Sequence, residues 1–177
     1  MIGISGTGKS SLSTKIGQLT GIPVYHMDGL IWKEQWKESS TEEITDSLKQ
    51  ILSADRWIIE GWIDQYSSEA LKAATTIIYL DYSGWLAFWR GIKRWWTYRG
   101  KQRPEMPAGC NESLNLKYLR TILSRQERPH IEKILAELSL PRLVRCATTT
   151  KTEKWLADLR RDFRMDNDSE HLSRHVD

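Results

Sequence analysis

The sequence predicts a single α/β domain in which helices cover both faces of a parallel sheet. Short apolar segments alternate along the chain with segments of helical periodicity, the pattern of repeated strand and helix units. The segment Thr76–Leu80 is continuously apolar, which is typical of a parallel strand buried on both faces. The length of 177 residues fits one domain. We assign residues 1–161 to that domain and expect the polar residues 162–177 to form a mobile C-terminal tail.

Five strands are expected, and helices with recognisable start signals separate them. The predicted strands are Met1–Ser5, Pro23–His26, Trp57–Glu60, Thr76–Leu80 and Leu143–Cys146. Leu12, Ile16 and Leu19 lie on one face of a helix that ends near Gly21. Capping-box patterns at residues 40–43 and 150–153 predict the starts of two more helices, and Pro129 suits the first turn of another.

The first strand runs into a glycine-rich loop, Gly3–Ser10, which reads Gly-Ile-Ser-Gly-Thr-Gly-Lys-Ser. This stretch fits G-x-x-x-x-G-K-[ST], a loop whose backbone N–H groups surround phosphates. Lys9 would reach the β- and γ-oxygens, and the Ser10 hydroxyl would bind Mg²⁺. The loop therefore predicts nucleoside triphosphate binding rather than an ordinary turn. We assign ATP binding to Gly3, Ser5, Gly6, Thr7, Gly8, Lys9, Ser10, Ser11, Arg94 and Arg99.

Only Met1 and Ile2 precede this loop, although such loops normally follow a strand of about five residues. We expect the first strand to be truncated, with the natural start of the chain upstream. The alternative is a central strand that is short by nature.

Acidic residues follow three of the predicted strands, at the edge where open α/β sheets bind ligands. Asp28 follows the second strand and is a candidate to accept a proton from an acceptor hydroxyl, although aspartate is also common in turns. Glu60 and Asp81 end the third and fourth strands. Either is a candidate Mg²⁺ ligand together with Ser10, and the sequence leaves the choice between the three acids open.

The predicted helix from about Trp85 to Trp96 has tryptophans on one side and Arg90 and Arg94 on the other. We expect most of the nine tryptophans in the chain to pack in the core or line a crevice. The arginines would then be free to clamp phosphate, unless they form a solvated basic face.

Glycines, prolines and bases mark residues 98–112 as a loop, which we interpret as a lid that excludes water from a bound triphosphate. Arg120, Arg125 and Arg128 farther on are candidates either for the same site or for solvated surface positions.

The composition is that of an ordinary globular protein with a formal net charge of +3, too small to indicate a nucleic-acid partner by itself. No apolar run is long enough to cross a bilayer, and Cys110 and Cys146 lack a metal-binding pattern. We expect a cytoplasmic monomer without a membrane partner.

These motifs together resemble a group of small kinase-like proteins related to adenylate kinase and shikimate kinase and known as DNA topology modulation proteins. The resemblance rests on the loop, on Met27–Trp32, Trp57–Trp62 and Ile77–Tyr82, on the Trp89–Arg94 segment, and on Arg99–Ser113. It implies a P-loop three-layer sandwich with strand order 2-3-1-4-5, a lid between the fourth and fifth strands, and ATP as phosphoryl donor. It implies no particular acceptor. Glu60 stands where the group usually has Asp, and Ser83-Gly84 replaces a usual Pro-Arg.

We therefore expect a kinase that transfers the γ-phosphoryl group of MgATP to a nucleotide, a nucleoside or a polar metabolite. By position in the resemblance, the catalytic residues would be Lys9, Asp28, Arg90 and Arg94. Two alternatives stay open: a nucleotide-binding regulator of DNA topology that uses the basic residues 85–103, and a catalytically idle ATP-binding module.

Overall fold

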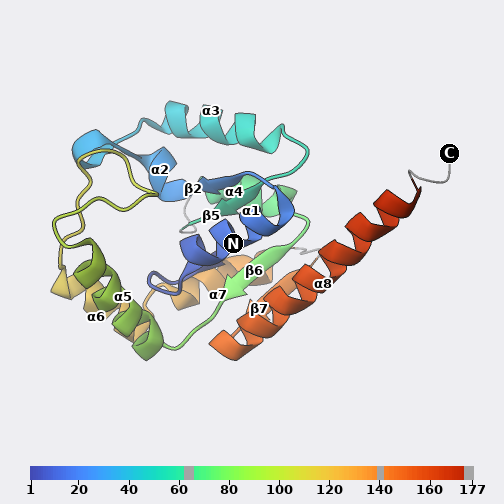
Figure 1. Cartoon of the computed structure of the whole chain (residues 1–177). Coiled ribbons are helices and arrows are strands. Elements are labelled where there is room, and N and C mark those ends of the chain that lie inside the picture. The colour runs from blue at the N-terminus through green and yellow to red at the C-terminus, as the bar shows by residue number, and fades with distance from the viewer. Residues whose placement is uncertain (62–65, 139–141, 174–177) are drawn as a thin grey trace.

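The computed structural model describes residues 1–61, 66–138 and 142–173, and it confirms the predicted α/β class (Figure 1). All five predicted strands form, each close to its expected place. They are β1 (Ile2–Gly3), β2 (Val24–His26), β5 (Ile58–Glu60), β6 (Ile77–Leu80) and β7 (Leu143–Cys146). Every pairing among them is parallel, in one sheet of order β1-β6-β7 and a second of order β2-β5.

The two parallel sheets meet at Met1. Its nitrogen donates to the Ile59 carbonyl at 2.5 Å, and the Gly61 N–H donates to the Met1 carbonyl at 3.4 Å. β1 therefore lies beside β5 as well as β6. The hydrogen bonds between β5 and β1 are confined to Met1 and do not form a ladder along the two strands. The resemblance implies the order β2-β5-β1-β6-β7. The pairing of β5 with β1 in that order stays a prediction.

Eight helices surround the strands in the described part of the chain. They are α1 (Lys9–Thr20), α2 (Met27–Ile31), α3 (Thr41–Leu52), α4 (Ser67–Ala73), α5 (Gly84–Tyr98), α6 (Leu116–Ser124), α7 (Arg128–Glu137) and α8 (Thr149–Ser173). A short antiparallel pair, β3 (Trp32–Lys33) and β4 (Lys37–Glu38), flanks a turn of 3-10 helix at Glu34–Trp36, and sequence patterns did not predict it. No helix among the described residues is long and apolar enough to cross a membrane.

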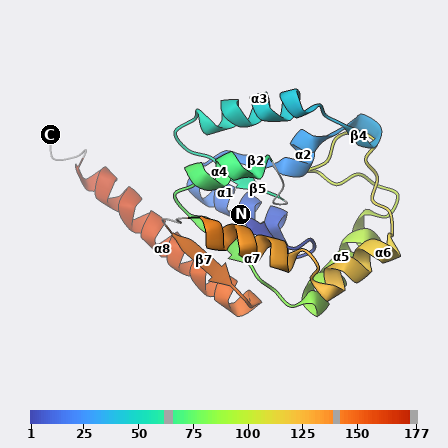
Figure 2. The same cartoon turned by 180° about the vertical axis from the view of Figure 1, so that it is seen from behind.

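Three clusters of buried side chains define the layers. α1 and α8 pack on one face of the β1-β6-β7 sheet through Leu12, Ile16 and Leu156. On the opposite face, α4 to α7 contribute a cluster around Tyr79. A third cluster joins α2, α3 and α4 to β5 (Figure 2). Helices thus cover both faces, as a parallel sheet requires.

Most helix boundaries follow their local signals. Ser40 and Glu43 form the predicted capping box of α3, and Gly21 ends α1 with φ +68°. The capping box predicted at residues 150–153 is wrong, because α8 already begins at Thr149. There the Thr148 hydroxyl accepts the N–H of Lys151 at 3.2 Å.

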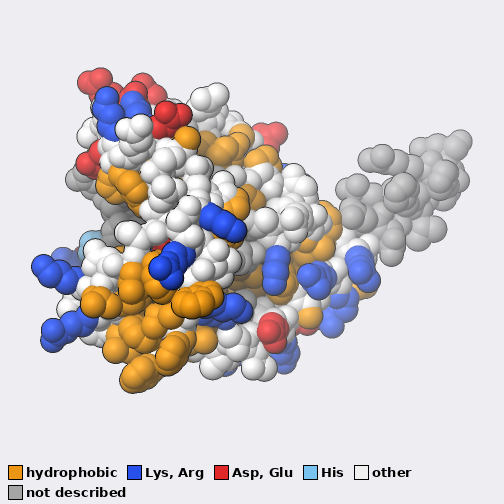
Figure 3. All heavy atoms as spheres, turned by 60° about the vertical axis from the view of Figure 1, so that its left-hand side comes forward, with side chains coloured by type: hydrophobic (Ala, Val, Ile, Leu, Met, Phe, Trp, Pro, Cys, Tyr) orange, Lys and Arg blue, Asp and Glu red, His pale blue; other side chains and the backbone are white. Residues whose placement is uncertain are grey.

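The expectation that most tryptophans pack in the core or line a crevice is wrong for three tryptophans of α5. Trp85, Trp89 and Trp96 are 62%, 59% and 71% exposed. Small residues face inward instead, because Gly84, Ala87 and Gly91 are the buried residues of α5. Hydrophobic side chains consequently gather on the surface at this end of the molecule, with Lys and Arg side chains near them (Figure 3).

At the C-terminal end, residues 162–173 continue α8, which extends away from the body of the molecule (Figure 1). The mobility expected of residues 162–173 stays a prediction. Residues 174–177, like Trp62 of the third-strand motif, lie outside the described residues.

Candidate functional site

The Gly3–Ser10 loop joins β1 to α1 and is held in shape by its own hydrogen bonds. The Lys9 ammonium donates to the carbonyls of Gly3 at 2.9 Å and Ile4 at 3.3 Å. The Thr7 hydroxyl donates to the Ile4 carbonyl at 2.8 Å. Gly6 has φ +80°, and a Cβ there would lie 2.4 Å from the Ala87 carbonyl oxygen, so only glycine fits where the loop meets α5.

A cavity of about 1380 Å³ opens in front of this loop. It brings together most of the residues that the sequence nominated: Ser5, Gly6, Thr7, Gly8, Lys9, Ser10, Ser11, Asp28, Glu60, Arg90 and Arg94. Gly3, Asp81 and Arg99 do not line it. Sequence patterns missed several lining residues that matter below, namely His26, Trp32, Trp36, Arg103, Glu112, Tyr118 and Glu127.

Glu60 is a buried carboxylate at the end of β5 beside the loop. It is 2.6 Å from Nδ1 of His26, and the Ser10 hydroxyl is a second hydrogen-bond partner. Burial raises the pKa of Glu60, but these hydrogen bonds and the Lys9 charge outweigh it, so the net pKa is lowered. The hydrogen bond to Glu60 in turn raises the pKa of His26 despite its partial burial.

The Lys9 ammonium is buried at the centre of the site. Desolvation lowers its pKa, and the nearby acids Glu60, Asp28 and Glu127 oppose that lowering. Three carboxylates therefore lie close enough to the Lys9 ammonium to interact with its charge. Asp28 itself lies in the first turn of α2, directly after β2, as its place in the sequence suggested.

The two predicted clamp arginines reach the cavity from the inner side of α5. Arg90 donates to the Thr7 carbonyl at 2.6 Å and stacks over the Tyr82 ring, with 4.9 Å between the guanidinium carbon and the ring centroid. Arg94 donates to Glu112 at 2.9 Å. Both arginines are thus held in place by hydrogen bonds within the protein. Their role as phosphate clamps stays a prediction.

Glu127 comes from the turn before α7 and contacts the loop directly. Its carboxylate accepts the Ser5 N–H at 3.1 Å. Burial raises the pKa of Glu127, against the effects of the Ser5 N–H and Lys9. Tyr118 of α6 is also hydrogen-bonded to Ser5, and burial raises the pKa of its phenol. No local sequence signal marks Glu127, because more than a hundred residues separate it from the loop.

Asp81, a candidate metal ligand, lies elsewhere. Its carboxylate contacts three arginines, namely Arg125, Arg128 at 2.9 Å and Arg145 at 2.5 Å. Burial raises the pKa of Asp81, but hydrogen bonds from Arg128 and Arg145 lower it overall. Oxygens that already neutralise three cations are poor metal ligands. We therefore no longer assign Asp81 as a Mg²⁺ ligand. Arg125 and Arg128, which pair with Asp81, are likewise no longer candidates for the phosphate site.

Arg99 also departs from its predicted place. It lies over the Trp95 ring with 5.6 Å between the guanidinium carbon and the ring centroid, outside the cavity. Arg103 takes the position within the cavity that was expected of Arg99. Its guanidinium is buried and lies 2.9 Å from Glu112, which thus pairs with both Arg94 and Arg103.

The interpreted lid is irregular apart from two isolated bridges, Arg99 to Glu112 and Gln102 to Asn111. It packs against the segment between β3 and β4. The Ala108 carbonyl accepts the Gln35 N–H at 3.0 Å, and the Cys110 thiol lies 3.3 Å from both the Lys33 carbonyl and the Trp36 N–H. The predicted loop is confirmed, and its function as a lid stays a prediction.

The oxygen ligands beside the loop fit Mg²⁺. Ser10 and Glu60 are hydrogen-bonded neighbours, and Mg²⁺ prefers a few hard oxygens together with water and substrate phosphate. Among the described residues, no group of three or more His, Cys, Asp or Glu side chains could hold a metal ion. This donor set therefore suits an ion that arrives with a phosphate ligand rather than one held by the protein alone.

A comparison with protein-family models found no match, and a comparison with curated proteins found none either. Among solved structures, the chain is similar to a deoxyadenosine kinase from M. mycoides with bound dCTP. The sequence identity is 18% and the TM-score is 0.45, over 89% of this chain and 96% of that one.

Proposed function

We propose that this protein is a P-loop kinase that transfers the γ-phosphoryl group of MgATP to a small polar acceptor, such as a nucleoside, a nucleotide or a polar metabolite. One observation carries the proposal: Lys9, Arg90, Arg94 and the loop converge on a single large cavity that also contains carboxylates. Phosphoryl transfer requires positioning and charge neutralisation more than a covalent nucleophile, and this cavity offers both.

Each group has a role that follows from its place. The N–H groups of the loop and the Lys9 ammonium would bind the β- and γ-phosphates in place of the carbonyls that Lys9 now contacts. Arg94 would turn from Glu112 toward the γ-phosphate, whose oxygens gain charge in transfer. Arg90, fixed on Thr7 and Tyr82, would keep the loop against α5 and flank the nucleotide.

Ser10 and Glu60 would hold Mg²⁺, which when bound shields the charge of the phosphate oxygens. His26 orients the Glu60 carboxylate through the 2.6 Å contact. Asp28, on the same side of the cavity, would accept the acceptor hydroxyl proton or orient that hydroxyl. The loop at residues 98–112 would cover the cavity and exclude water, which competes with any acceptor for the phosphoryl group.

The proposal is tested by measuring ADP release from MgATP in the presence of a panel of nucleosides, nucleoside monophosphates and polar metabolites. We expect one class of acceptor to stimulate release. Lys9→Ala should lower the stimulated rate by about a hundredfold or more. Lys49→Ala is the matched control, because Lys49 is an exposed lysine on α3.

Stimulated turnover that survives Lys9→Ala would contradict the proposed role of the loop. Tight ATP binding without turnover for any acceptor would instead favour the idle ATP-binding module.

One observation favours the DNA-contacting alternative as a second candidate. The exposed tryptophans of α5 lie on a segment, residues 83–104, that has bases and no acids, and aromatic and basic side chains together suit nucleic acid. This candidate requires salt-sensitive binding of DNA that Arg99→Ala weakens and Lys9→Ala leaves unchanged. The opposite pattern, or no binding, removes it.

A further inference from the structure

The surface formed by α5 and α6 exposes large apolar side chains (Figure 3). Single apolar residues on a protein surface are ordinary, but a patch of them marks an interaction site. Three indoles of α5 that are each more than half exposed present roughly 400 Å² of such surface. Among the described residues, most exposed large hydrophobic side chains lie on these two helices or directly before α6, namely Trp85, Trp89, Trp96, Leu114 and Leu116.

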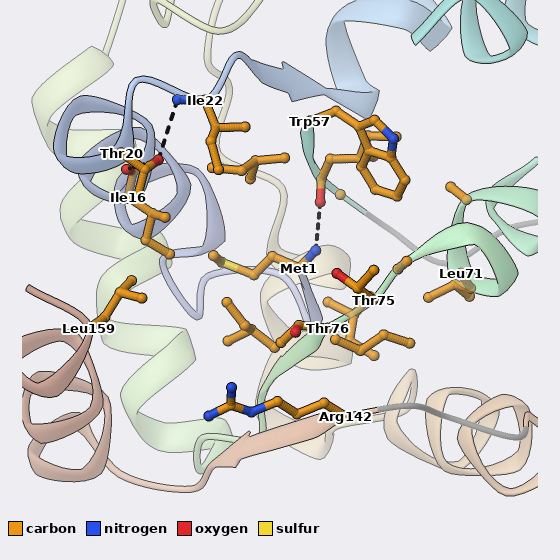
Figure 4. Close-up of a pocket in the computed structure, with 18 of the residues that line it drawn as sticks. Met1, Ile16, Thr20, Ile22, Trp57, Leu71, Thr75, Thr76, Arg142 and Leu159 are labelled. Atoms are coloured by element: carbon orange, nitrogen blue, oxygen red, sulfur yellow. Dashed lines mark hydrogen bonds between the residues drawn. The ribbon is translucent and has the colours of Figure 1, made fainter. Parts of the chain in front are cut away.

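The three indoles of α5, the tryptophan stripe, share one side of the helix. Steps of four and seven residues separate Trp85, Trp89 and Trp96, so all three point away from the side with the buried small residues. They line neither the large cavity in front of the phosphate loop nor a smaller one of about 440 Å³ beside Met1 (Figure 4). The tryptophan stripe is therefore a surface for a partner that covers it from outside.

The exposed charges around this stripe have one sign. Neither α5 nor α6 contains an acidic residue. The acids that precede the two helices, Asp81 and Glu112, have side chains that are only 7% exposed and that pair with arginines. The bases that α5, the loop after it and α6 expose are Lys93, Arg99, Lys101, Lys117 and Arg120. This surface is thus complementary to an anionic partner.

The same charges disfavour a second copy of this chain as the partner. In a symmetric dimer through α5, each surface patch faces the same patch of the other copy. Bases would then lie opposite bases, and neither α5 nor α6 offers an acid to pair with them. Like charges that face each other across an interface are unfavourable.

Nucleic acid is anionic as well, but it covers this surface poorly. Single strands stack their bases on the faces of aromatic rings within a basic groove. Trp85 and Trp89 instead lie along the outside of a helix, and both pack edge-to-face with Phe88, at centroid distances of 6.0 and 5.7 Å. A lipid layer covers the rings and neutralises the bases together, because indoles bind between headgroups and acyl chains.

We propose that the surface of α5 and α6 binds an anionic lipid surface, with the tryptophan stripe inserted among the lipids and the bases on acidic headgroups. Lys93 lies four residues after Trp89 and three before Trp96, so it borders the stripe. Its apolar stem can lie along the rings while its ammonium contacts a headgroup. The binding departs from the expectation of no membrane partner, since a helix that lies on a membrane needs no spanning run. It is independent of the proposed kinase activity.

The test measures binding of the full chain to vesicles by cosedimentation. We expect vesicles of phosphatidylcholine mixed with phosphatidylserine to bind at least about tenfold more tightly than phosphatidylcholine alone, because each base near an anionic surface contributes about fivefold. Joint Trp85→Ser and Trp89→Ser substitution should weaken binding to the acidic vesicles by about tenfold or more. Leu143→Ser, at an exposed apolar position on β7, is the matched control and should bind like the wild type.

A charge variant tests the bases separately from the rings. Lys93→Glu should weaken binding to the acidic vesicles by about fivefold or more. Lys49→Glu, at an exposed position on α3, is its control and should leave binding unchanged. Circular dichroism spectra that match the wild type establish that each variant is folded.

Lipids with brominated acyl chains distinguish insertion from attraction by charge alone, because bromine quenches nearby indoles. We expect quenching of the wild type and a clear reduction of it in the double tryptophan variant. Failure of the wild type to bind acidic vesicles would overturn the proposal, as would equal binding by the double variant. A dimer, or an oligonucleotide complex, that requires these tryptophans and forms without vesicle binding would overturn it in favour of that partner.

Discussion

The Glu127 carboxylate has the same charge sign as the phosphate that we propose the loop to bind. It accepts the Ser5 N–H, a donor that the loop otherwise presents to the cavity, and it lies close enough to interact with Lys9. Phosphate binding must therefore displace this carboxylate or protonate it. Its raised pKa makes protonation easier than for an exposed glutamate.

We accordingly expect Glu127→Gln to bind MgATP several-fold more tightly than the wild type at pH 8, because the amide keeps the size but removes the charge. The affinity of the wild type should rise as the pH falls toward the raised pKa of Glu127, and the variant should lack this rise. Isothermal titration calorimetry across pH 6 to 8 measures both effects. Glu132→Gln is the control, because Glu132 pairs with Arg128 and Arg145 instead. Equal or weaker binding by Glu127→Gln would show that the carboxylate supports the nucleotide site.

The His26–Glu60 pair makes folding stability depend on pH. The pKa of His26 in the folded state is raised above 6.5. The stability that His26 contributes to the fold is therefore complete below pH 6.5, and it is lost as the pH rises through the folded-state pKa. The pKa of Glu60 is lowered, so its contribution is lost at the acid end, as the pH falls through its folded-state pKa. The pair thus stabilises the fold in the window between these two values.

We expect the free energy of unfolding of the wild type to fall by up to ~1 kcal/mol as the pH rises above 6.5 through the folded-state pKa of His26, which is only partly buried. His26→Gln should flatten this part of the profile. Urea unfolding at several pH values measures the slope. Parallel slopes for the two proteins would mean that another group controls the pH dependence.

At the level of elements, the start of α5 and the end of α6 approach closely at Gly84. A Cβ at this position would lie 2.0 Å from the Leu123 carbonyl oxygen, and backbone atoms cannot yield as a flexible side chain can. Gly91, one further contact along α5, faces the Leu119 side chain at 3.2 Å. The two glycines let the helices pack close to each other.

We expect Gly84→Ala to destabilise the protein by about 1–3 kcal/mol, the usual cost of forcing extra atoms into a packed contact. Gly29→Ala is the matched control, because its Cβ would meet the Glu105 carbonyl oxygen at an ordinary 3.4 Å. Chemical denaturation of both variants gives the comparison. If Gly84→Ala were as stable as Gly29→Ala, the close approach of α5 and α6 would not be a feature of the folded protein in solution.

The same helix shows what the sequence could and could not predict. Periodicity correctly predicted where α5 lies in the sequence and that its two faces differ in composition. Which face packs inward depends on the neighbouring helices, which local periodicity does not show. Gly84, Ala87 and Gly91 recur at helical spacing, and this stripe of small residues was the available signal for the packed side. Hydrophobicity favoured the tryptophan side instead, and the structure exposes it.

Local signals predicted the strands, the loop and the cap of α3, because a few neighbouring residues determine each of them. The candidate site was predictable where its residues follow strand ends, as Asp28 and Glu60 do. Glu127 reaches the cavity only through the packing of α7, so no local pattern marks it. Arg103 lies within the predicted 98–112 loop, but local composition did not show which of the bases in that loop enters the cavity. Asp81 was misplaced because its three arginine partners come from α7, β7 and the turn after α6.

At the scale of the whole molecule, residues 98–112 connect regions that are otherwise far apart in the chain. Glu112 pairs with Arg94 of α5 and with Arg103, while Ala108 and Cys110 contact the segment between β3 and β4. The loop thus spans the cavity from the α5 side to the α2 side. At the α5 end of the loop, the Glu112 carboxylate is the group that pairs with both arginines.

We expect Glu112→Gln to loosen this loop and to raise the rate of trypsin cleavage after Arg99 and Lys101 several-fold, because cleavage requires local opening. Mass spectrometry of timed digests identifies the sites. Glu137→Gln, at an exposed position on α7, should leave the rate unchanged. Unaltered cleavage at both sites in Glu112→Gln would show that the contacts of Ala108 and Cys110 are enough to hold the loop.

The aromatic pair at the far end of that loop has a practical consequence. Trp32 and Trp36 both line the large cavity, with ring centroids 5.6 Å apart and planes at 74°, and the backbone N–H of Trp36 donates to the Cys110 sulfur. Indole emission is sensitive to local polarity and to neighbouring groups, so filling the cavity should alter the fluorescence of these two rings. The tryptophans of α5 do not line the cavity, so their emission would supply a background to the signal of these two rings. The unlabelled protein thereby carries its own optical reporter for screening candidate nucleotides and acceptors.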